Sequence, residues 1–238
     1  MSTITADHRV TQVLRTRSDP FRKLLEWGGF AAGAILVAFG VVAISMGFSG
    51  RATVADSLKL EKITGSADMT PALIAKEAKE AGLTGVSLPT VPVAGKAIDS
   101  GPRARAFASY MRIHALEATG GYTYSQMGRF MAKPGTPKAQ LAVGGGTDNS
   151  QYALIDAANK QPVTNGARNL WVTETALTTA LNTSYMAQQL SLFGIVVGAA
   201  LLLAGIGFGI LALGGALESP RKAFSFSKRE VEAPHAAL

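Results

Sequence analysis

The sequence contains no cysteine, and it has only three histidines. The first absence excludes disulfide bonds and removes the thiolates that bind metal ions or act as nucleophiles. His8 and His235 lie near the two ends, so His114 is the only histidine in the interior. Aromatic residues are also few, at 7%, and they are not interleaved with the scattered basic residues. The net charge of +7 therefore does not indicate nucleic-acid binding.

Two long stretches of the sequence lack charged residues altogether. One covers the 24 residues 27–50, and the other covers the 43 residues 175–217. Because a helix of about 20 apolar residues crosses a bilayer, these stretches predict transmembrane helices at 26–48 and 188–217. The first stretch is longer than the apolar region of a signal peptide, which has roughly 7–15 residues. We therefore expect an uncleaved membrane anchor.

Basic residues lie just outside the two predicted transmembrane helices, five in the tail 1–25 and four in the tail 218–238. The positive-inside rule predicts that both tails, and hence both termini, are cytoplasmic. The segment 49–187 is then extracytoplasmic, because long loops are translocated largely regardless of their charge. The predicted fold is a mainly α membrane protein in the cytoplasmic (inner) membrane. It is a two-helix transmembrane hairpin with an inserted, mostly helical extracytoplasmic domain.

The first part of this domain shows three local patterns. Residues 56–65 alternate apolar and charged side chains, which predicts a short strand. A helix follows in "TPALIAKEAKEAGL", where Thr70 is the expected N-cap, Pro71 suits the first turn and Gly82 follows the last turn. Two prolines in residues 86–97 predict an extended segment that is at most an edge strand.

The second part of the domain begins with a helix in "SGPRARAFASYMRIHALEATGG", which Ser100 or Gly101 caps and Gly120 ends. A short helix is expected at 122–131. Glycine, proline and small polar residues predict a flexible loop at 134–151.

The last helix of the domain begins near "NGARNLW", residues 165–171. Neither Gly nor Pro interrupts residues 167–193, so we expect this helix to run unbroken into the membrane, with Tyr185 near the lipid headgroups.

His114 is the strongest single candidate for chemistry. With Glu117 three residues further on, it has the spacing of a general base or ligand paired with a carboxylate. No Ser or Cys nucleophile stands in a recognisable motif near it, so we prefer a structural role, a half-buried histidine before a Gly-Gly helix stop. It shares one predicted helix face with Phe107, Met111 and Ala118.

Two other motifs have structural interpretations that we prefer. "GGGTDN" at 144–149 lacks the Lys-Ser/Thr pair of a phosphate-binding P-loop, so it is predicted to be a plain loop. Glu77 and Glu80 lie on a helix that also carries lysines, which is typical of a solvated charged face. We therefore predict no catalytic, cofactor-binding or metal-binding residue and no cofactor.

Small residues recur every seven positions in both predicted transmembrane helices. Such stripes let helix backbones approach closely, which is how helices associate in lipid. Glycine is also simply common in membrane helices, but the same period in both helices favours packing. The predicted helix-packing residues are Gly29, Gly33, Gly40, Gly47, Ser191, Gly194, Gly198, Gly205, Gly209 and Ala212.

The segments "AGKAIDSGPRARAFASYMRIHALEATGGYTYSQMGR" and "NTSYMAQQLSLFGIVVG" resemble a family of small two-helix membrane proteins from actinobacteria, which is uncharacterised. The resemblance implies the two-helix architecture and says little about chemistry. Some members carry the label aromatic ring-opening dioxygenase. Non-haem iron oxygenases commonly use two histidines and one carboxylate, whereas the predicted extracytoplasmic segment contains one histidine. We therefore reject that activity for this chain.

These patterns predict a non-enzymatic protein, an accessory subunit or scaffold of a larger cell-envelope or membrane complex. The expected partners are the lipid bilayer and other membrane proteins, with a homo-oligomer as a further candidate and no nucleic acid. The alternative is an extracytoplasmic ligand-binding or sensor module anchored by two helices. In that case a pocket lined by aromatic residues is the candidate site, namely Tyr110, Tyr122, Tyr124 and Phe130.

Overall fold

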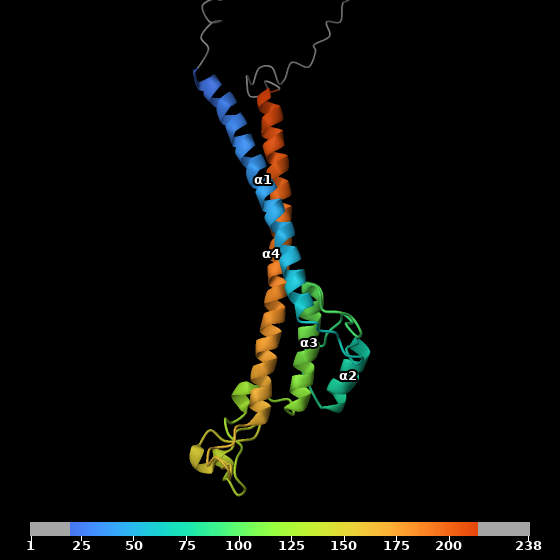
Figure 1. Cartoon of the computed structure of the whole chain (residues 1–238), viewed down its shortest axis with the longest axis vertical. Coiled ribbons are helices and arrows are strands. Elements are labelled where there is room, and N and C mark those ends of the chain that lie inside the picture. The colour runs from blue at the N-terminus through green and yellow to red at the C-terminus, as the bar shows by residue number, and fades with distance from the viewer. Residues whose placement is uncertain (1–19, 214–238) are drawn as a thin grey trace, which may run out of the picture. The chain divides into compact units, whose positions relative to one another are not determined.

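The computed structural model describes residues 20–213, and the predictions for most of the two basic tails lie outside this range. The described part is mainly helical (Figure 1). Within it there is no β-strand, only isolated β-bridges. The α-helices are α1 (Pro20–Leu60), α2 (Pro71–Glu80), α3 (Gly101–Ala118) and α4 (Gly166–Leu213).

The chain divides into two compact units. Unit 1 contains the chain up to Met46 and from Gly194 onward, and unit 2 is Gly47–Phe193. The long helices α1 and α4 each contribute one segment to unit 1 and one to unit 2. Each unit is described separately below.

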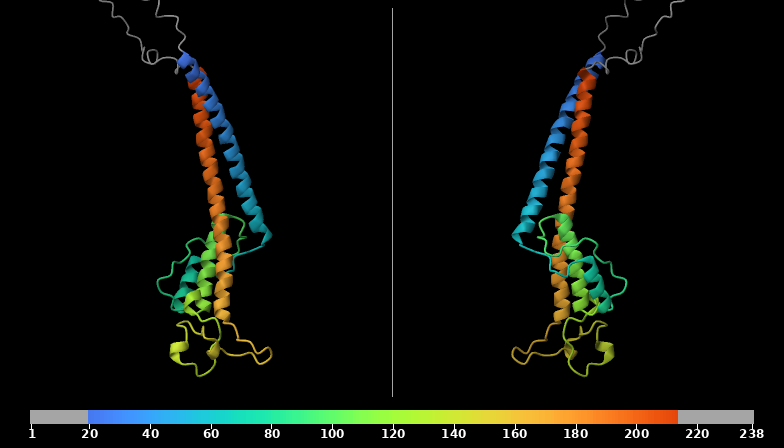
Figure 2. Two further views of the ribbon diagram at one scale, coloured as in Figure 1. Left: turned by 90° about the vertical axis from the view of Figure 1, so that its left-hand side faces the viewer. Right: turned by 90° about the vertical axis from the view of Figure 1, so that its right-hand side faces the viewer.

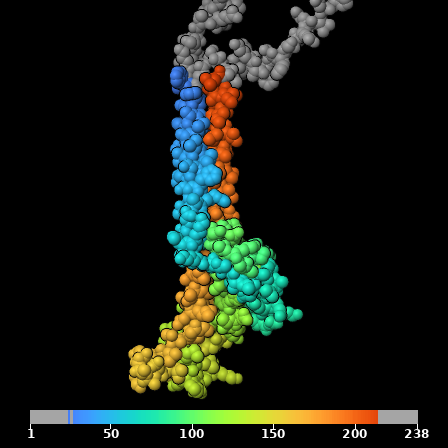
Figure 3. All heavy atoms as spheres, turned by 45° about the vertical axis from the view of Figure 1, so that its right-hand side comes forward, coloured from blue at the N-terminus to red at the C-terminus, as the bar shows by residue number. Residues whose placement is uncertain are grey.

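Unit 1 consists, in its described part, of two apolar helical segments packed side by side (Figures 1 and 3). Both parent helices are long and apolar enough to cross a membrane. Only 11% of the most apolar window of each helix is buried, whereas a core helix of a soluble protein would be mostly buried. Exposed apolar side chains such as Phe39 and Leu203 cover the surface of these segments. In lipid, such side chains meet a solvent as apolar as themselves.

Helix α1 does not end at residue 48 but continues to Leu60, so the strand predicted at 56–65 is wrong. Over a few residues a period of two and a period of 3.6 fit the same sequence. Leu58 is buried, and the half-buried Val54 lies four residues before it, which is the helical spacing. Helix α1 has 41 residues and is about 60 Å long, roughly twice the hydrocarbon thickness.

Helices α2 and α3 lie side by side in unit 2 (Figure 2). The predicted α2 is confirmed, because the Thr70 hydroxyl accepts a hydrogen bond from the Leu73 N–H and Pro71 is the first helical residue. Gly82 follows with a positive φ of +66°, the conformation that a helix C-terminus often needs. The predicted α3 is confirmed as well, with Ser100 as N-cap and Gly120 in the left-handed region.

The main core of unit 2 lies where α2, α3 and short parts of α1 and α4 meet. Its fully buried side chains include Ile74 of α2 and Tyr110 and Ile113 of α3, and Leu181 of α4 packs with them. The predicted extended segment 86–97 contributes Val93 to this core. It makes only single bridges, from Ala94 to Gly65 and from Ala97 to Thr64.

Residues 119–165 are irregular, and Met127 of this segment joins residues of α3 and α4 in a second, smaller core. Ala115, Leu116, Met127 and Trp171 form it. The short helix expected at 122–131 is reduced to one 3-10 turn, Tyr124–Gln126. The loop predicted at 134–151 is irregular apart from two further 3-10 turns, Lys138–Gln140 and Ser150–Tyr152.

Helix α4 begins at Gly166, within the predicted starting stretch, and runs unbroken to Leu213. Its N-terminal segment packs along α3 within unit 2. There the side-chain oxygen of the buried Gln188 accepts a hydrogen bond from the Gly101 N–H at 2.6 Å, which satisfies a free donor at the start of α3. Arg105 and Arg112 of α3 also stack on aromatic rings of α4, those of Tyr185 and Trp171.

Candidate functional site

The predicted glycine stripe lies at the contact between the two helical segments of unit 1. A Cβ atom added to Gly33 would lie 2.9 Å from the carbonyl oxygen of Gly205, and one added to Gly205 would lie 2.6 Å from that of Gly33. Gly40 and Gly198 face each other in the same way, at 2.7 and 2.8 Å. All four glycines are buried. Even a methyl group would collide with backbone, so these positions require glycine for the observed packing.

Two other predicted stripe residues, Gly194 and Gly209, are less closely packed. A Cβ at Gly194 would make an ordinary contact of 3.8 Å with the Ala43 carbonyl oxygen, and one at Gly209 would meet nothing within 4 Å. Gly209 therefore has room for a side chain, unlike Gly205 one turn before it. Of the remaining members, Gly47 is buried, and the half-buried ones are Gly29, Ser191 and Ala212.

In unit 2, three residues that offer metal-ligand atoms converge between α2 and α3. Nε2 of His114 lies 3.2 Å from Oδ2 of Asp68, and Nδ1 lies 3.7 Å from Oε2 of Glu77. Glu117, the partner expected from the sequence, is more distant, with Oε2 at 4.0 Å from Nδ1. One atom from each of Asp68, Glu77 and His114 lies within 4.8 Å of the other two. We call these three residues the His114 cluster.

The local fold explains why these residues meet. Asp68 lies in the turn before α2, where its carbonyl oxygen accepts a hydrogen bond from the N–H of the N-cap Thr70. Glu77 is three residues after the buried Ile74 and directly before the buried Ala78, so it borders the face of α2 that packs on α3. His114 follows Tyr110 by four residues on the buried side of α3.

The sequence suggested that Glu77 and Glu80 share a solvated charged face, but Glu77 does not belong to such a face. Its side chain is 27% exposed, whereas that of Glu80 is 65% exposed and pairs with Lys76 at 3.8 Å. The two glutamates differ because only Glu77 borders the apolar side of α2. In the sequence, the position of Glu77 three residues after the apolar Ile74 could have indicated this border position. Glu80 lies three residues after Glu77, and that spacing instead suggested a charged face shared by the two glutamates.

The cluster holds carboxylate oxygens that are poorly satisfied. Oδ1 of Asp68 and Oε2 of Glu77 are shielded from solvent and have no hydrogen-bond partner. The Ser66 hydroxyl lowers the pKa of Asp68 below its ordinary value of 3.8, against the effect of partial burial, and the nearby His114 lowers it further. Asp68 is therefore ionised at neutral pH.

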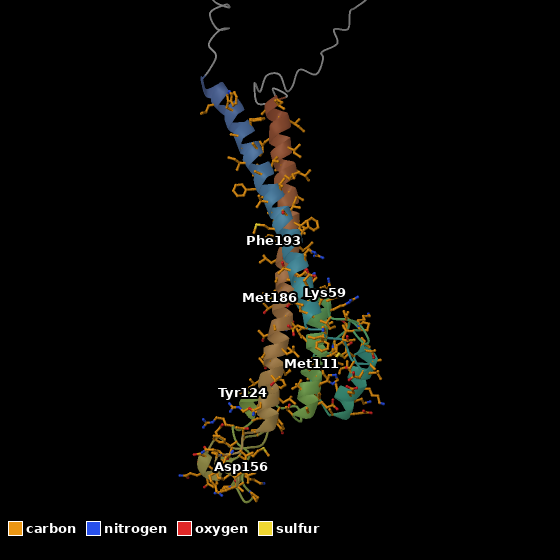
Figure 4. The ribbon with its side chains drawn as sticks, in the orientation of Figure 1. Lys59, Met111, Tyr124, Asp156, Met186 and Phe193 are labelled. Carbon is orange, nitrogen blue, oxygen red and sulfur yellow. The ribbon has the colours of Figure 1, made fainter. Side chains whose placement is uncertain are left out.

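His114 also lines a groove between α3 and the N-terminal segment of α4. The groove has a volume of about 280 Å³, and its walls are mostly apolar, with Met111 (labelled in Figure 4) and Leu177 on opposite helices. Glu174 lines the same groove, although it is only 4% exposed, and its Oε1 has no hydrogen-bond partner. The groove thus combines an imidazole and a buried carboxylate in an apolar setting.

The remaining sequence candidates have structural places. Tyr110 lies in the main core and Tyr122 packs on the second core, while the ring of Tyr124 lies 4.0 Å under the Arg168 guanidinium. The aromatic residues thus do not gather around one pocket. In the glycine-rich loop, Oδ1 of Asp148 accepts hydrogen bonds from the backbone N–H and Nε of Arg129, as suits a plain loop.

Comparison of the chain with protein-family models, with curated proteins and with solved structures finds no match. The class that the fold itself defines is a mainly helical protein with two helices long and apolar enough to span a membrane.

Proposed function

We propose that the chain is a two-helix transmembrane hairpin that presents residues 49–187 outside the cytoplasmic membrane and serves as an accessory subunit or scaffold of a membrane complex. One observation carries this proposal: the backbone-to-backbone contact at Gly33–Gly205 and Gly40–Gly198. Lipid supplies no hydrophobic force between helices, so such close packing is what holds a membrane hairpin together. The resemblance to two-helix actinobacterial membrane proteins supports the same architecture.

The register of these contacts supports an antiparallel hairpin. Gly33, the earlier glycine of α1, pairs with Gly205, the later glycine of α4. Gly40, the later glycine of α1, pairs with Gly198, the earlier glycine of α4. The outer surface of the pair remains apolar, with Phe39 and Leu203 more than half exposed. That surface suits lipid or the helices of a partner protein.

A cross-linking experiment tests the hairpin. The chain has no cysteine, so Ala43→Cys combined with Gly194→Cys reports one contact cleanly. In native membranes, a short thiol cross-linker should join the two introduced cysteines within one chain, without change in the mass of the monomer. The control is Ala43→Cys with Gly209→Cys, which lies 15 residues away on α4, about 22 Å along the helix axis. Equal cross-linking of both pairs, or cross-linked dimers only, would contradict the hairpin.

The accessory role needs a separate test. Tagged full-length protein, purified from its native membranes in mild detergent, should migrate in native electrophoresis as a complex larger than the 24.7 kDa chain with its detergent. Mass spectrometry of the excised band then identifies the partner. A particle that contains only this chain would refute a role in a hetero-complex and leave the homo-oligomer.

A second candidate function is favoured by the groove beside α3. A ligand-binding domain needs a concave, mostly apolar site with a few polar groups, and the groove with His114 and Glu174 has this character. Native mass spectrometry of the purified protein would support this function if it detected a bound small molecule that Leu177→Trp removes. The larger tryptophan side chain would fill the groove from the α4 side.

A further inference from the structure

We propose that the His114 cluster binds a divalent transition-metal ion, with Asp68, Glu77 and His114 as its protein ligands. This inference goes beyond the membrane role above and is independent of it. From the sequence we predicted no metal ligand. The proposed site differs from that prediction because its three residues meet only in the folded domain.

The chemistry of the three donors fits such an ion. Imidazole nitrogen suits zinc, iron, copper and nickel, and carboxylate oxygen is a regular zinc ligand alongside histidine. A neutral imidazole and two carboxylates together carry a charge of −2, which balances a divalent cation. Three protein ligands also leave coordination positions free for water or another ligand.

The unsatisfied oxygens point to the same ligand. A buried carboxylate oxygen without a partner is costly, and native proteins rarely retain one without a reason. Here two such oxygens, Oδ1 of Asp68 and Oε2 of Glu77, occur in residues of the same cluster. A cation between the two carboxylates would compensate their negative charges and relieve the repulsion between them.

The three ligand atoms need to move only slightly closer together to bind one ion. The three ligand atoms lie within 4.8 Å of one another. In a tetrahedral zinc site with bonds of about 2.1 Å, ligand atoms are separated by about 3.4 Å. Side-chain rotations at the half-buried Asp68 and Glu77 can supply this difference without a shift of α2 or α3, since neither side chain is locked by complete burial.

The groove between α3 and α4 also gives access to His114, which lines it. Its mostly apolar wall contains the buried carboxylate of Glu174, whose Oε1 has no hydrogen-bond partner. Glu174 is not one of the three proposed ligands.

Zinc titration of the full-length protein tests the proposal. The protein is purified in detergent in a His8→Gln, His235→Gln background, which leaves His114 as the only histidine, and is stripped with a chelator that is then removed. Isothermal titration calorimetry with zinc chloride should show one saturable site per chain. Cobalt(II) should give visible absorption typical of a nitrogen and oxygen site with few ligands, and zinc should abolish it.

Variants identify the ligands. Asp68→Asn, Glu77→Gln and His114→Gln should each weaken zinc binding at least about tenfold, since even residues that only support metal ligands have effects of 10–100-fold. The matched control is Glu80→Gln, which removes the same charge from the exposed side of α2 and should bind zinc normally. Circular dichroism verifies that each variant retains its helices.

Two results would overturn the proposal. One is the absence of saturable zinc and cobalt binding by the unsubstituted cluster, which needs no variant to interpret. The other is an equal loss of affinity in Glu77→Gln and Glu80→Gln, which would show that zinc responds only to the overall negative charge of α2.

Discussion

Tyr110 shows how a single side chain joins α3 to the extended segment before it. The residue is fully buried in the main core, and its hydroxyl donates a hydrogen bond to the Val91 carbonyl oxygen at 3.2 Å. The other hydrogen bonds between segment 86–97 and the rest of the domain involve residues 93–97, such as the one from the Val93 N–H to the Met69 carbonyl oxygen, so the Tyr110 hydroxyl holds the earlier part of the segment.

Removing the hydroxyl should therefore destabilise unit 2. Tyr110→Phe keeps the ring but leaves the Val91 carbonyl without this donor, and we expect a loss of about 1 kcal/mol in the free energy of unfolding. Thermal unfolding in detergent, followed by circular dichroism, measures the change. Tyr124→Phe is the control, because Tyr124 is exposed and the substitution should change stability by less than about 0.5 kcal/mol.

The same residue predicts a dependence on alkaline pH. Burial raises the pKa of Tyr110 above its ordinary value of 10.0. Above pH 10 the unfolded chain loses the phenolic proton more readily than the folded one, so the contribution of Tyr110 to stability should be constant below pH 10 and fall above it. The fall in melting temperature between pH 9 and 11 should be smaller in Tyr110→Phe. An identical fall in both proteins would contradict the assignment.

Among the elements, α1 and α4 owe their pairing in unit 1 to a few positions on each helix. The residues Gly205 and Gly207 are two apart on α4, yet they differ completely in their surroundings. A Cβ at Gly205 would lie 2.6 Å from the Gly33 carbonyl oxygen, whereas a Cβ at Gly207 would meet nothing within 4 Å. The stripe is thus a property of one helix face and not of glycine content.

This difference gives a matched pair of substitutions. Gly205→Ala should weaken the pairing by about 1–3 kcal/mol, as overpacking does, and should reduce the cross-linking of the Ala43→Cys, Gly194→Cys protein. Gly207→Ala should leave cross-linking unchanged and stabilise the helix slightly, by up to about 1 kcal/mol. If both substitutions reduced cross-linking equally, the contact at Gly205 would have no special role.

For the whole molecule, the distribution of basic residues predicts the orientation in the membrane. Nine Lys and Arg residues lie in the two tails, which favours a cytoplasmic location for both. Single cysteines introduced as Ser2→Cys, Ser150→Cys and Ser225→Cys report the side of each region. A membrane-impermeant maleimide applied to intact cells should label only the Ser150→Cys protein, since Ser150 is exposed in the domain. Labelling of a cysteine in either tail would contradict the predicted orientation.

Several features of the molecule were already determined by the sequence alone. The absence of charge over residues 27–50 and 175–217 predicted two long apolar helices, because length and hydropathy are local properties. Thr70, Pro71 and Gly82 predicted the ends of α2, since capping depends on residues within one turn of each other. The same local reasoning failed at residues 56–65, where two periodicities fit and packing of Leu58 decided for the helix.

Only the tertiary structure decided which side chains meet. His114 is far from Asp68 and Glu77 in sequence, and it meets them because α2 packs on α3. The seven-residue period singled out both glycine stripes, but the pairing of Gly33 with Gly205 and the open space at Gly209 depend on the rotation of each helix about its axis. Spacing along the chain determines which residues share a face, whereas the partner of that face is set by packing between distant segments.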